Sequence, residues 1–113
     1  MDQREALILA RQYASVVAHE LHPDKIVLYG SYAKEAASGK SDIDVAVIFH
    51  NFNGDWLRVY TRLSHLRRSV SSLIEPVLLD SANDKSGFVD EVLATGEVIY
   101  ESRQDMRPGL EKR

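Results

Sequence analysis

The stretch that decides the fold spans residues 26–48 and reads IVLYGSYAKEAASGKSDIDVAVI. Two apolar runs, residues 26–29 and 45–48, enclose a middle that carries glycine, serine, lysine and aspartate. Short apolar runs bounded by turn-forming residues are typical of strands. We therefore expect a strand, a turn, a short helix over residues 32–37, a polar loop over residues 38–41, and a second strand that begins at the aspartates.

Two aspartates open the second strand with one residue between them. Side chains alternate along a strand, so Asp42 and Asp44 lie on one face and Ile43 lies on the other. Two like charges a few Å apart repel by roughly 1 to 4 kcal/mol at dielectric constants between those of water and a protein surface. A divalent cation with oxygen ligands removes this cost, and magnesium is typically bound by one or two carboxylates together with substrate phosphates. The pair is therefore a candidate magnesium site.

The end of the first strand supplies groups for the complementary anion. Gly30 lets the backbone approach a ligand closely, and the hydroxyl of Ser31, with the free amides that open the next helix, favours a phosphate. Lys34 and Lys40 are further candidates for phosphate contact, with a solvated surface position as the alternative for each. Together with the aspartates, these residues indicate a site for a metal-chelated phosphate.

The order Gly30-Ser31, ten residues, then Asp42 and Asp44 one residue apart resembles the signature of the nucleotidyltransferases that share the fold of DNA polymerase beta. The chain length and Ser41 before the first aspartate are most similar to the minimal nucleotidyltransferases, the MNT antitoxins of HEPN/MNT toxin–antitoxin pairs. The resemblance covers nearly the whole ordered chain. It implies an α/β (α+β) fold of the polymerase-beta type, a small mixed sheet with helices packed on one side and the carboxylate face open.

The resemblance also implies a role for each residue of the motif. The family's third carboxylate falls on the strand expected over residues 73–80, where Glu75 would act as general base and help to hold a metal; Asp80 is the weaker alternative. Pro76 suits an edge strand or a bulge better than a central strand, because proline has no N–H for a sheet ladder. The implied catalytic and metal-binding residues are Asp42, Asp44 and Glu75, and the implied nucleotide-binding residues are Gly30, Ser31 and Lys40.

By the same resemblance, the reaction is magnesium-dependent transfer of AMP from ATP to a hydroxyl, with release of pyrophosphate. The MNT antitoxins modify a tyrosine of a HEPN ribonuclease toxin, so we expect a hetero-oligomer with such a toxin as the partner. Two alternatives stay open. One is a non-catalytic module that neutralises its partner by occlusion, which the pairs Lys34-Glu35 and Glu75-Pro76 allow. The other is nucleotidyl transfer to a small molecule or an RNA end.

Composition limits the class of protein. At 113 residues, with 44% hydrophobic and 27% charged residues, the chain is typical of one soluble domain. A net charge of -3 gives no basic footprint for direct nucleic-acid binding. The sequence has no cysteine, no secretory signal and no apolar run near the roughly 20 residues that span a bilayer, so we expect a cytoplasmic protein without membrane contact. We expect the domain at residues 1–100 and a mobile tail at residues 101–113.

Three further helices complete the expected elements. Apolar spacing predicts a helix over residues 2–21, a helix over residues 56–72, and a short helix from residue 88 that is closed by Gly96. A last strand covers residues 98–100. The second helix carries an arginine-rich face, which we interpret either as solvated or as a contact surface for a triphosphate or an acidic partner. Its members are Arg58, Arg62, Arg67 and Arg68.

Overall fold

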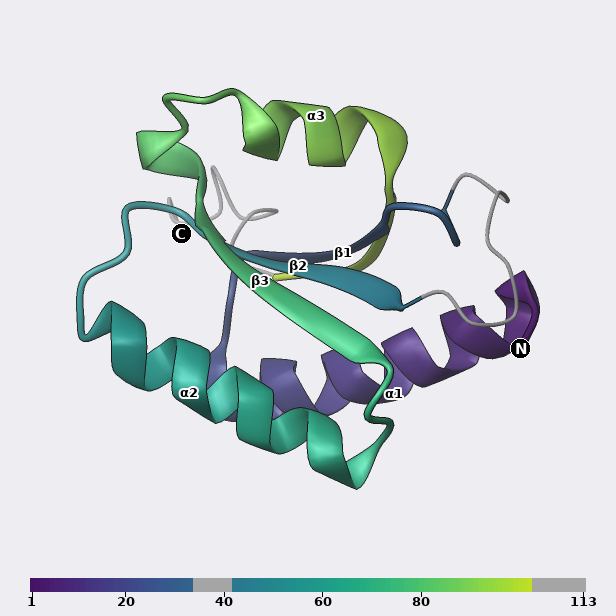
Figure 1. Cartoon of the computed structure of the whole chain (residues 1–113). Coiled ribbons are helices and arrows are strands. Elements are labelled where there is room, and N and C mark those ends of the chain that lie inside the picture. The colour runs from purple at the N-terminus through teal and green to yellow at the C-terminus, as the bar shows by residue number, and fades with distance from the viewer. Residues whose placement is uncertain (34–41, 103–113) are drawn as a thin grey trace, which may run out of the picture.

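A computed structural model describes residues 1–33 and 42–102 of the chain. Its helices and strands are interspersed along the chain (Figure 1), and the expected mixed α/β class is confirmed. The short helix and polar loop expected between the first two strands, with Lys34 and Lys40, lie outside the described residues. In chain order the elements are α1 (Gln3–Leu21), β1 (Lys25–Tyr29), β2 (Ile43–Phe49), α2 (Trp56–Leu66), the 3₁₀ turn η1 (Arg67–Ser69), β3 (Ile74–Asp80), the 3₁₀ turn η2 (Ser81–Asn83), α3 (Phe88–Thr95) and β4 (Glu97–Glu101).

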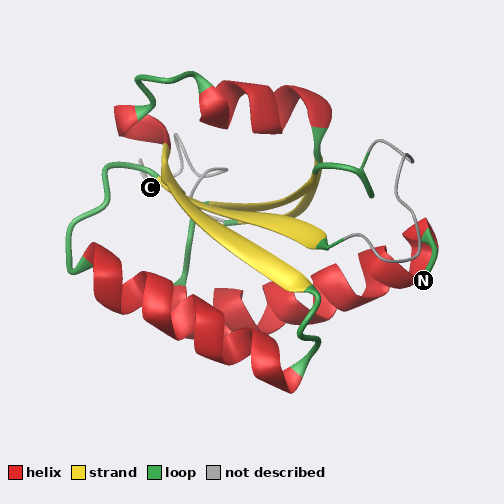
Figure 2. Cartoon of the chain, in the orientation of Figure 1, coloured by secondary structure: helices red, strands yellow, loops and turns green. Residues whose placement is uncertain are grey.

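The four strands form one mixed sheet in the order β3-β2-β1-β4. Figure 2 shows the strands between helices above and below them. β1 pairs antiparallel with both β2 and β4, whereas β2 and β3 run parallel. β3 is therefore an edge strand, as Pro76 predicts, because an edge tolerates a residue that cannot donate to the ladder. The parallel pairing places the starts of β2 and β3 side by side.

Helices cover the two faces of the sheet unequally (Figure 1). Ile43, Val45 and Val47 of β2 are buried in the core that includes α1 and α2. The alternate residues Ala46 and Ile48 pack with α3 on the other face. The expectation that all helices lie on one side therefore holds for α1 and α2 but not for α3. The buried residues of β2 that pack in the cluster with α3 are Ala46 and Ile48, which follow the aspartates along the strand.

α1 lies where it is predicted, and contacts fix both its N-terminus and its position against α2. Asp2 caps the first turn in a capping box with Glu5, so that two backbone N–H groups gain acceptors. Within the core, the buried hydroxyl of Tyr13 donates to the carbonyl of Leu63 in α2 at 2.8 Å. Neither α1 nor any other helix of the described residues is long and apolar enough to cross a membrane.

α2 ends earlier than the sequence predicts. It was expected to continue to residue 72, but it stops at Leu66 and is followed by η1. The hydroxyl of Ser69 donates to the carbonyl of Leu66 at 3.0 Å, and the backbone N–H of Ser71 donates to the carbonyl of Arg67 at 2.8 Å. Serine hydroxyls that bond nearby backbone groups compete with a continuing helix, which explains the early end.

The C-terminal part of the described chain extends the sheet. α3 is followed by Gly96, its expected closing residue. β4 continues to Glu101, which was expected to open the tail; Lys25 of β1 faces it, with Nζ 3.6 Å from the carboxylate. The remainder of the predicted tail, residues 103–113, lies outside the described residues.

Asp80 at the end of β3 holds together the loop that follows β2. Its carboxylate accepts backbone N–H groups from Asn51 at 2.7 Å, Phe52 at 2.9 Å and Ala82 at 2.9 Å, and the side-chain amide of Asn83 at 3.0 Å. Burial raises the pKa of Asp80, but these hydrogen bonds outweigh it and lower the pKa to about 2. Asp80 is therefore a structural carboxylate at the opposite end of β3 from Glu75.

Asp80→Ala should reduce the free energy of unfolding at neutral pH by about 1 to 2 kcal/mol, the lower part of the range for bonds to a charged group, because water screens this site. A lowered pKa in the folded state gives stability that is complete above the unfolded value of about 3.9 and is lost as the pH falls toward the folded value. Urea unfolding at several pH values measures both effects. Asp90→Ala, on the exposed side of α3, is the control and should cost less.

Candidate active site

The sheet register brings the predicted carboxylates to one row. In the ladder, Asp44 of β2 lies opposite Tyr29 of β1 on one side and opposite Glu75 of β3 on the other. Directly paired residues of neighbouring strands have side chains on the same face. Asp42 precedes β2 by one residue and is exposed. The structure thus brings Asp42, Asp44 and Glu75 to the face that α3 covers only in part.

The charges of this row act on one another. Burial raises the pKa of the half-buried Asp44, and the neighbouring carboxylates of Asp42 and Glu75 raise it further. The pKa of Tyr29 is also raised, first by burial and then by Asp44 and Glu75. Each negative charge makes the next one harder to form. This end of the face therefore favours a cation.

Gly30 lies directly against Asp44. Its φ is +78°, and a Cβ atom added to it would lie 2.2 Å from Oδ2 of Asp44. Glycine meets both demands, since it adopts positive φ without a steric cost and leaves space for the carboxylate. The two halves of the sequence motif, the glycine turn and the aspartate strand, are in contact.

The turn after Gly30 is anchored from both sides. Ser31 is half-buried, and Tyr32 after it is almost completely buried in the core under α1. The side-chain amide of Gln3, in the first turn of α1, donates to the carbonyl of Tyr32 at 2.7 Å. The turn that carries Ser31 is therefore held in place beside Asp44. Lys40 lies outside the described residues, so its role in nucleotide binding stays a prediction.

Glu75 is on the expected strand and face, but its carboxylate has a partner of its own. Oε2 of Glu75 is 3.3 Å from Nη1 of Arg67, and the same nitrogen donates to the carbonyl of Ile74 at 2.8 Å. The side chains are 31% exposed for Arg67 and 52% exposed for Glu75, so the pair lies at the rim of the sheet. Glu75 is near Asp44 in the ladder and is held by an arginine.

The fit of this site to magnesium rests on two carboxylates. Within residues 1–33 and 42–102, no group of three or more histidine, cysteine or acidic side chains is placed to hold a metal ion. Asp42 and Asp44 share one face, and their charges raise the cost of ionising Asp44. Two such oxygen donors suit magnesium, which takes its other ligands from water and substrate phosphates.

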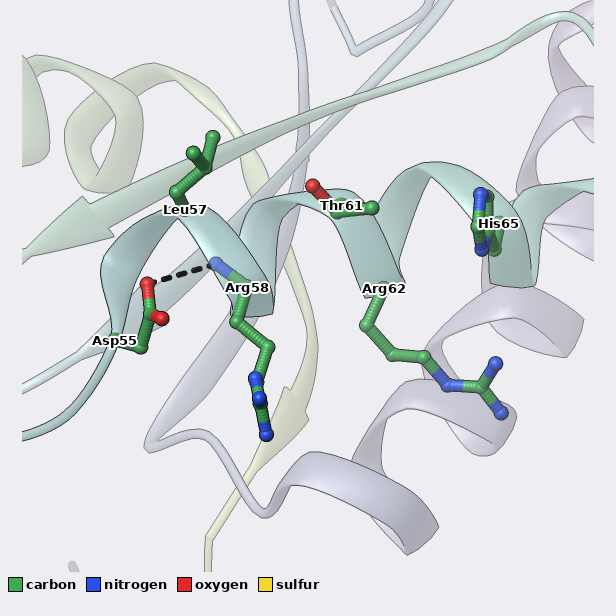
Figure 3. A pocket seen from close by; sticks show the side chains of 6 residues that line it. All are labelled: Asp55, Leu57, Arg58, Thr61, Arg62 and His65. Carbon is green, nitrogen blue, oxygen red and sulfur yellow. Dashed lines mark hydrogen bonds between the residues drawn. The ribbon is translucent and has the colours of Figure 1, made fainter.

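Arg58 and Arg62, the two members of the arginine-rich face that lie on α2, are on the other side of the sheet from Asp44, whereas Arg67 and Arg68 follow in η1. A hollow of about 430 Å³ follows the exposed side of α2 and contains none of the motif residues (Figure 3). Arg62 forms a bidentate ion pair with Glu20 of α1, in which Nε and Nη2 each donate to one carboxylate oxygen, Nη2 at 2.9 Å. This face is not the nucleotide site of the motif. The residues that line the hollow are Asp55, Leu57, Arg58, Thr61, Arg62 and His65.

The structure brings the glycine turn of the motif against the carboxylate of Asp44, with the Asp42 carboxylate as a neighbouring charge. Residues 12–105 match the protein family described as Polymerase beta, Nucleotidyltransferase. The chain belongs to this family and is a nucleotidyltransferase. No curated protein sequence matches the chain.

Solved structures share the fold. A candidate nucleotidyltransferase from Sulfolobus solfataricus is 20% identical, with a TM-score of 0.64 over 88% of this chain and 83% of that one. A toxin–antitoxin crystallised with AMP-PNP is 20% identical, with a TM-score of 0.58 over 90% and 82% of the two chains. A mutant of the toxin–antitoxin MntA-HpeT is 17% identical, with a TM-score of 0.50 over 99% and 83%. At these identities the likeness shows the fold, which agrees with the resemblance noted in the sequence.

Sequence reasoning missed two residues beside the site. Tyr29 packs edge-to-face on Phe88 of α3, with ring centroids 5.8 Å apart, and forms an aromatic wall next to Asp44. Because Tyr29 directly precedes Gly30 at the end of the predicted strand, the sequence alone could have placed it beside the site. Arg67 was assigned only to the basic face of a helix. No local pattern indicates that it reaches Glu75, since this contact depends on where α2 ends.

Gly30→Ala should abolish metal-dependent nucleotide binding, because the added methyl group would displace the carboxylate of Asp44. The positive φ should also reduce the free energy of unfolding by about 1 to 2 kcal/mol. Gly87→Ala is a matched control, since Gly87 has the same φ of +78° and no atom within 4 Å of an added Cβ. Calorimetric titration and thermal unfolding compare the two variants. Equal nucleotide binding by both would contradict the role given to the contact.

Asp44→Asn should raise the thermal unfolding midpoint at neutral pH. Because the folded pKa of Asp44 is raised, the native state binds more protons than the unfolded state from about pH 3.9 up to the folded pKa, and its stability falls as the pH rises through that interval. The advantage of asparagine should therefore vanish in acid. Scanning calorimetry at several pH values checks this. Asp80→Asn is a control of opposite sign, since it should lower stability at neutral pH.

Proposed function

We propose that the chain is a magnesium-dependent antitoxin that transfers AMP from ATP to a tyrosine hydroxyl of a partner HEPN ribonuclease toxin. The observation that carries the proposal is the contact of Gly30 with the Asp44 carboxylate, which joins a phosphate-binding turn to a metal-binding pair in a chain of the nucleotidyltransferase family. The two toxin–antitoxin neighbours, one of them crystallised with AMP-PNP, support the biological setting.

The residues of the site divide the chemistry between them. The turn of Gly30 and Ser31 would bind the phosphates of ATP, and Asp42 and Asp44 would hold the magnesium ion. Bound magnesium supplies charge neutralisation and alignment for in-line displacement. The acceptor oxygen forms a bond to the α-phosphorus, the bond from that phosphorus to the bridging oxygen breaks, and pyrophosphate leaves. Glu75 would accept the proton of the acceptor hydroxyl.

The exposure of the row suits an acceptor carried by another protein. Asp42 and Glu75 are both exposed at the starts of their strands, while the aromatic pair of Tyr29 and Phe88 covers one side. A tyrosine that projects from a partner could reach such an open edge. The absence of cysteine from the sequence fits a reducing compartment, so the proposal places this reaction in the cytoplasm, where ATP is abundant.

One observation favours a second candidate function, neutralisation of the toxin by occlusion alone. The ion pair with Arg67 engages Glu75, the group that would accept the proton, and the described residues do not form a three-carboxylate cluster. In that case the chain would bind its partner and no AMP would be transferred.

The test begins with calorimetric titration of AMP-PNP into the chain, with and without magnesium. Binding should require magnesium and should be lost in the double variant Asp42→Asn/Asp44→Asn, because the metal loses both anionic ligands. Asp90→Asn/Glu91→Gln is the matched control, since it removes two acidic charges from α3 and should bind as the wild type does. Magnesium-independent binding, or its survival in the aspartate variant, would contradict the site.

The acceptor is tested on the complex. The chain is co-purified with its toxin, incubated with ATP and magnesium, and the toxin is weighed by intact mass spectrometry. A mass increase of one or more AMP units that is absent with the aspartate variant supports transfer to the toxin. A stable, neutralised complex without any increase would support occlusion instead.

A further inference from the structure

Arg67 connects the end of α2 to the start of β3. As the first residue of η1, it follows directly on the break in the helix. One guanidinium nitrogen, Nη1, donates to the carbonyl of Ile74 at 2.8 Å and lies 3.3 Å from Oε2 of Glu75. Two acceptors on consecutive residues therefore fix the side chain, which is more than a surface ion pair with a single contact provides.

The neighbouring arginine has no comparable role. Arg68 is exposed, and it forms no ion pair with any residue of the described ranges 1–33 and 42–102. The two residues carry the same charge and are adjacent in the chain. A comparison of Arg67 with Arg68 therefore separates a specific contact from a general effect of positive charge.

The position of Glu75 results from two forces that act in the same direction. Asp44 lies opposite it in the ladder, and the two negative charges repel each other. Arg67 at the rim attracts the carboxylate and bonds it. Both forces favour a Glu75 carboxylate that lies away from Asp44, and no three-carboxylate group placed to hold a metal is present among the described residues.

We propose that Arg67 is a positioning residue that holds the Glu75 carboxylate at the rim, outside the metal-binding pair, so that a divalent cation binds tightly only together with the nucleotide phosphates. With two carboxylates, the site gives a free cation few ligands. A third carboxylate would add charge and donor atoms, and would bind the cation without the nucleotide. This inference rests on the proposed function, because it assumes that Asp42 and Asp44 are metal ligands.

The experiment measures Mn²⁺ binding in the absence of nucleotide by electron paramagnetic resonance. Arg67→Met should raise the affinity for free Mn²⁺ roughly tenfold, within the range of coupling between contacting residues. Arg68→Met should change it much less. In the background of Glu75→Gln, the effect of Arg67→Met should shrink to that of Arg68→Met, because the carboxylate that moves is gone.

Two further variants guard against a folding defect. Arg67→Gln removes the charge but keeps a donor for the carbonyl of Ile74. It should bind free Mn²⁺ more tightly than the wild type does, and it replaces Arg67→Met in the experiment if that variant is unstable. Arg67→Lys keeps the charge and should remain close to the wild type. Thermal unfolding of each variant shows that the binding values come from folded protein.

Two results would overturn the inference: an effect of Arg67→Met no larger than that of Arg68→Met, or the same effect with and without the Glu75 carboxylate. If AMP-PNP still binds to the wild type in a metal-dependent way that requires Asp42 and Asp44, either result leaves the proposed function standing. If the wild type binds Mn²⁺ neither alone nor with AMP-PNP, the proposed function and this inference both fail.

Discussion

The site depends on the antiparallel pairing of β1 with β2. This pairing sets Tyr29 opposite Asp44, and the turn after β1 then brings Gly30 against the carboxylate, where a side chain of any size would collide with Oδ2. A shift of one residue in the register would turn Asp44 into the core and expose Val45. The buried residues that hold the register, such as Ile26 and Val47, therefore also hold Gly30 and Asp44 side by side.

The sequence predicted most of the fold and which residues of the motif would lie together, whereas their roles stay a prediction. β1, β2, β3 and α1 lie where alternation and helical spacing place them, since each buries one regular face. The edge position of β3 followed from Pro76. The early end of α2 and the packing of α3 on the second face were not predicted, because both depend on contacts that the local sequence pattern does not show. The same limit applies to Glu75, whose strand and face were predicted but whose bond to Arg67 was not.

Asp80 and Asp44 have the same side chain, but their surroundings affect the charged form in opposite directions. Asp80 is surrounded by N–H donors, so its charge stabilises the loop after β2. Asp44 is half-buried beside two other carboxylates, and within residues 1–33 and 42–102 no N–H donor lowers its pKa. The charge of Asp44 at the start of β2 thus destabilises the folded state, whereas the charge of Asp80 at the end of β3 stabilises it. Such a difference is expected where a ligand, and not the protein, supplies the opposite charge.

Pro76 has a consequence for how other chains can approach the protein. An edge strand offers unpaired N–H and C=O groups to which a foreign strand can add. A proline on such a strand is tolerated where its missing N–H would face solvent, and there the missing donor interrupts the hydrogen-bond template. Pro76 follows Glu75 directly, so strand addition is disfavoured right next to the carboxylate row. A partner protein therefore gains fewer backbone hydrogen bonds at this part of the edge, and the same interruption disfavours sheet-to-sheet aggregation there.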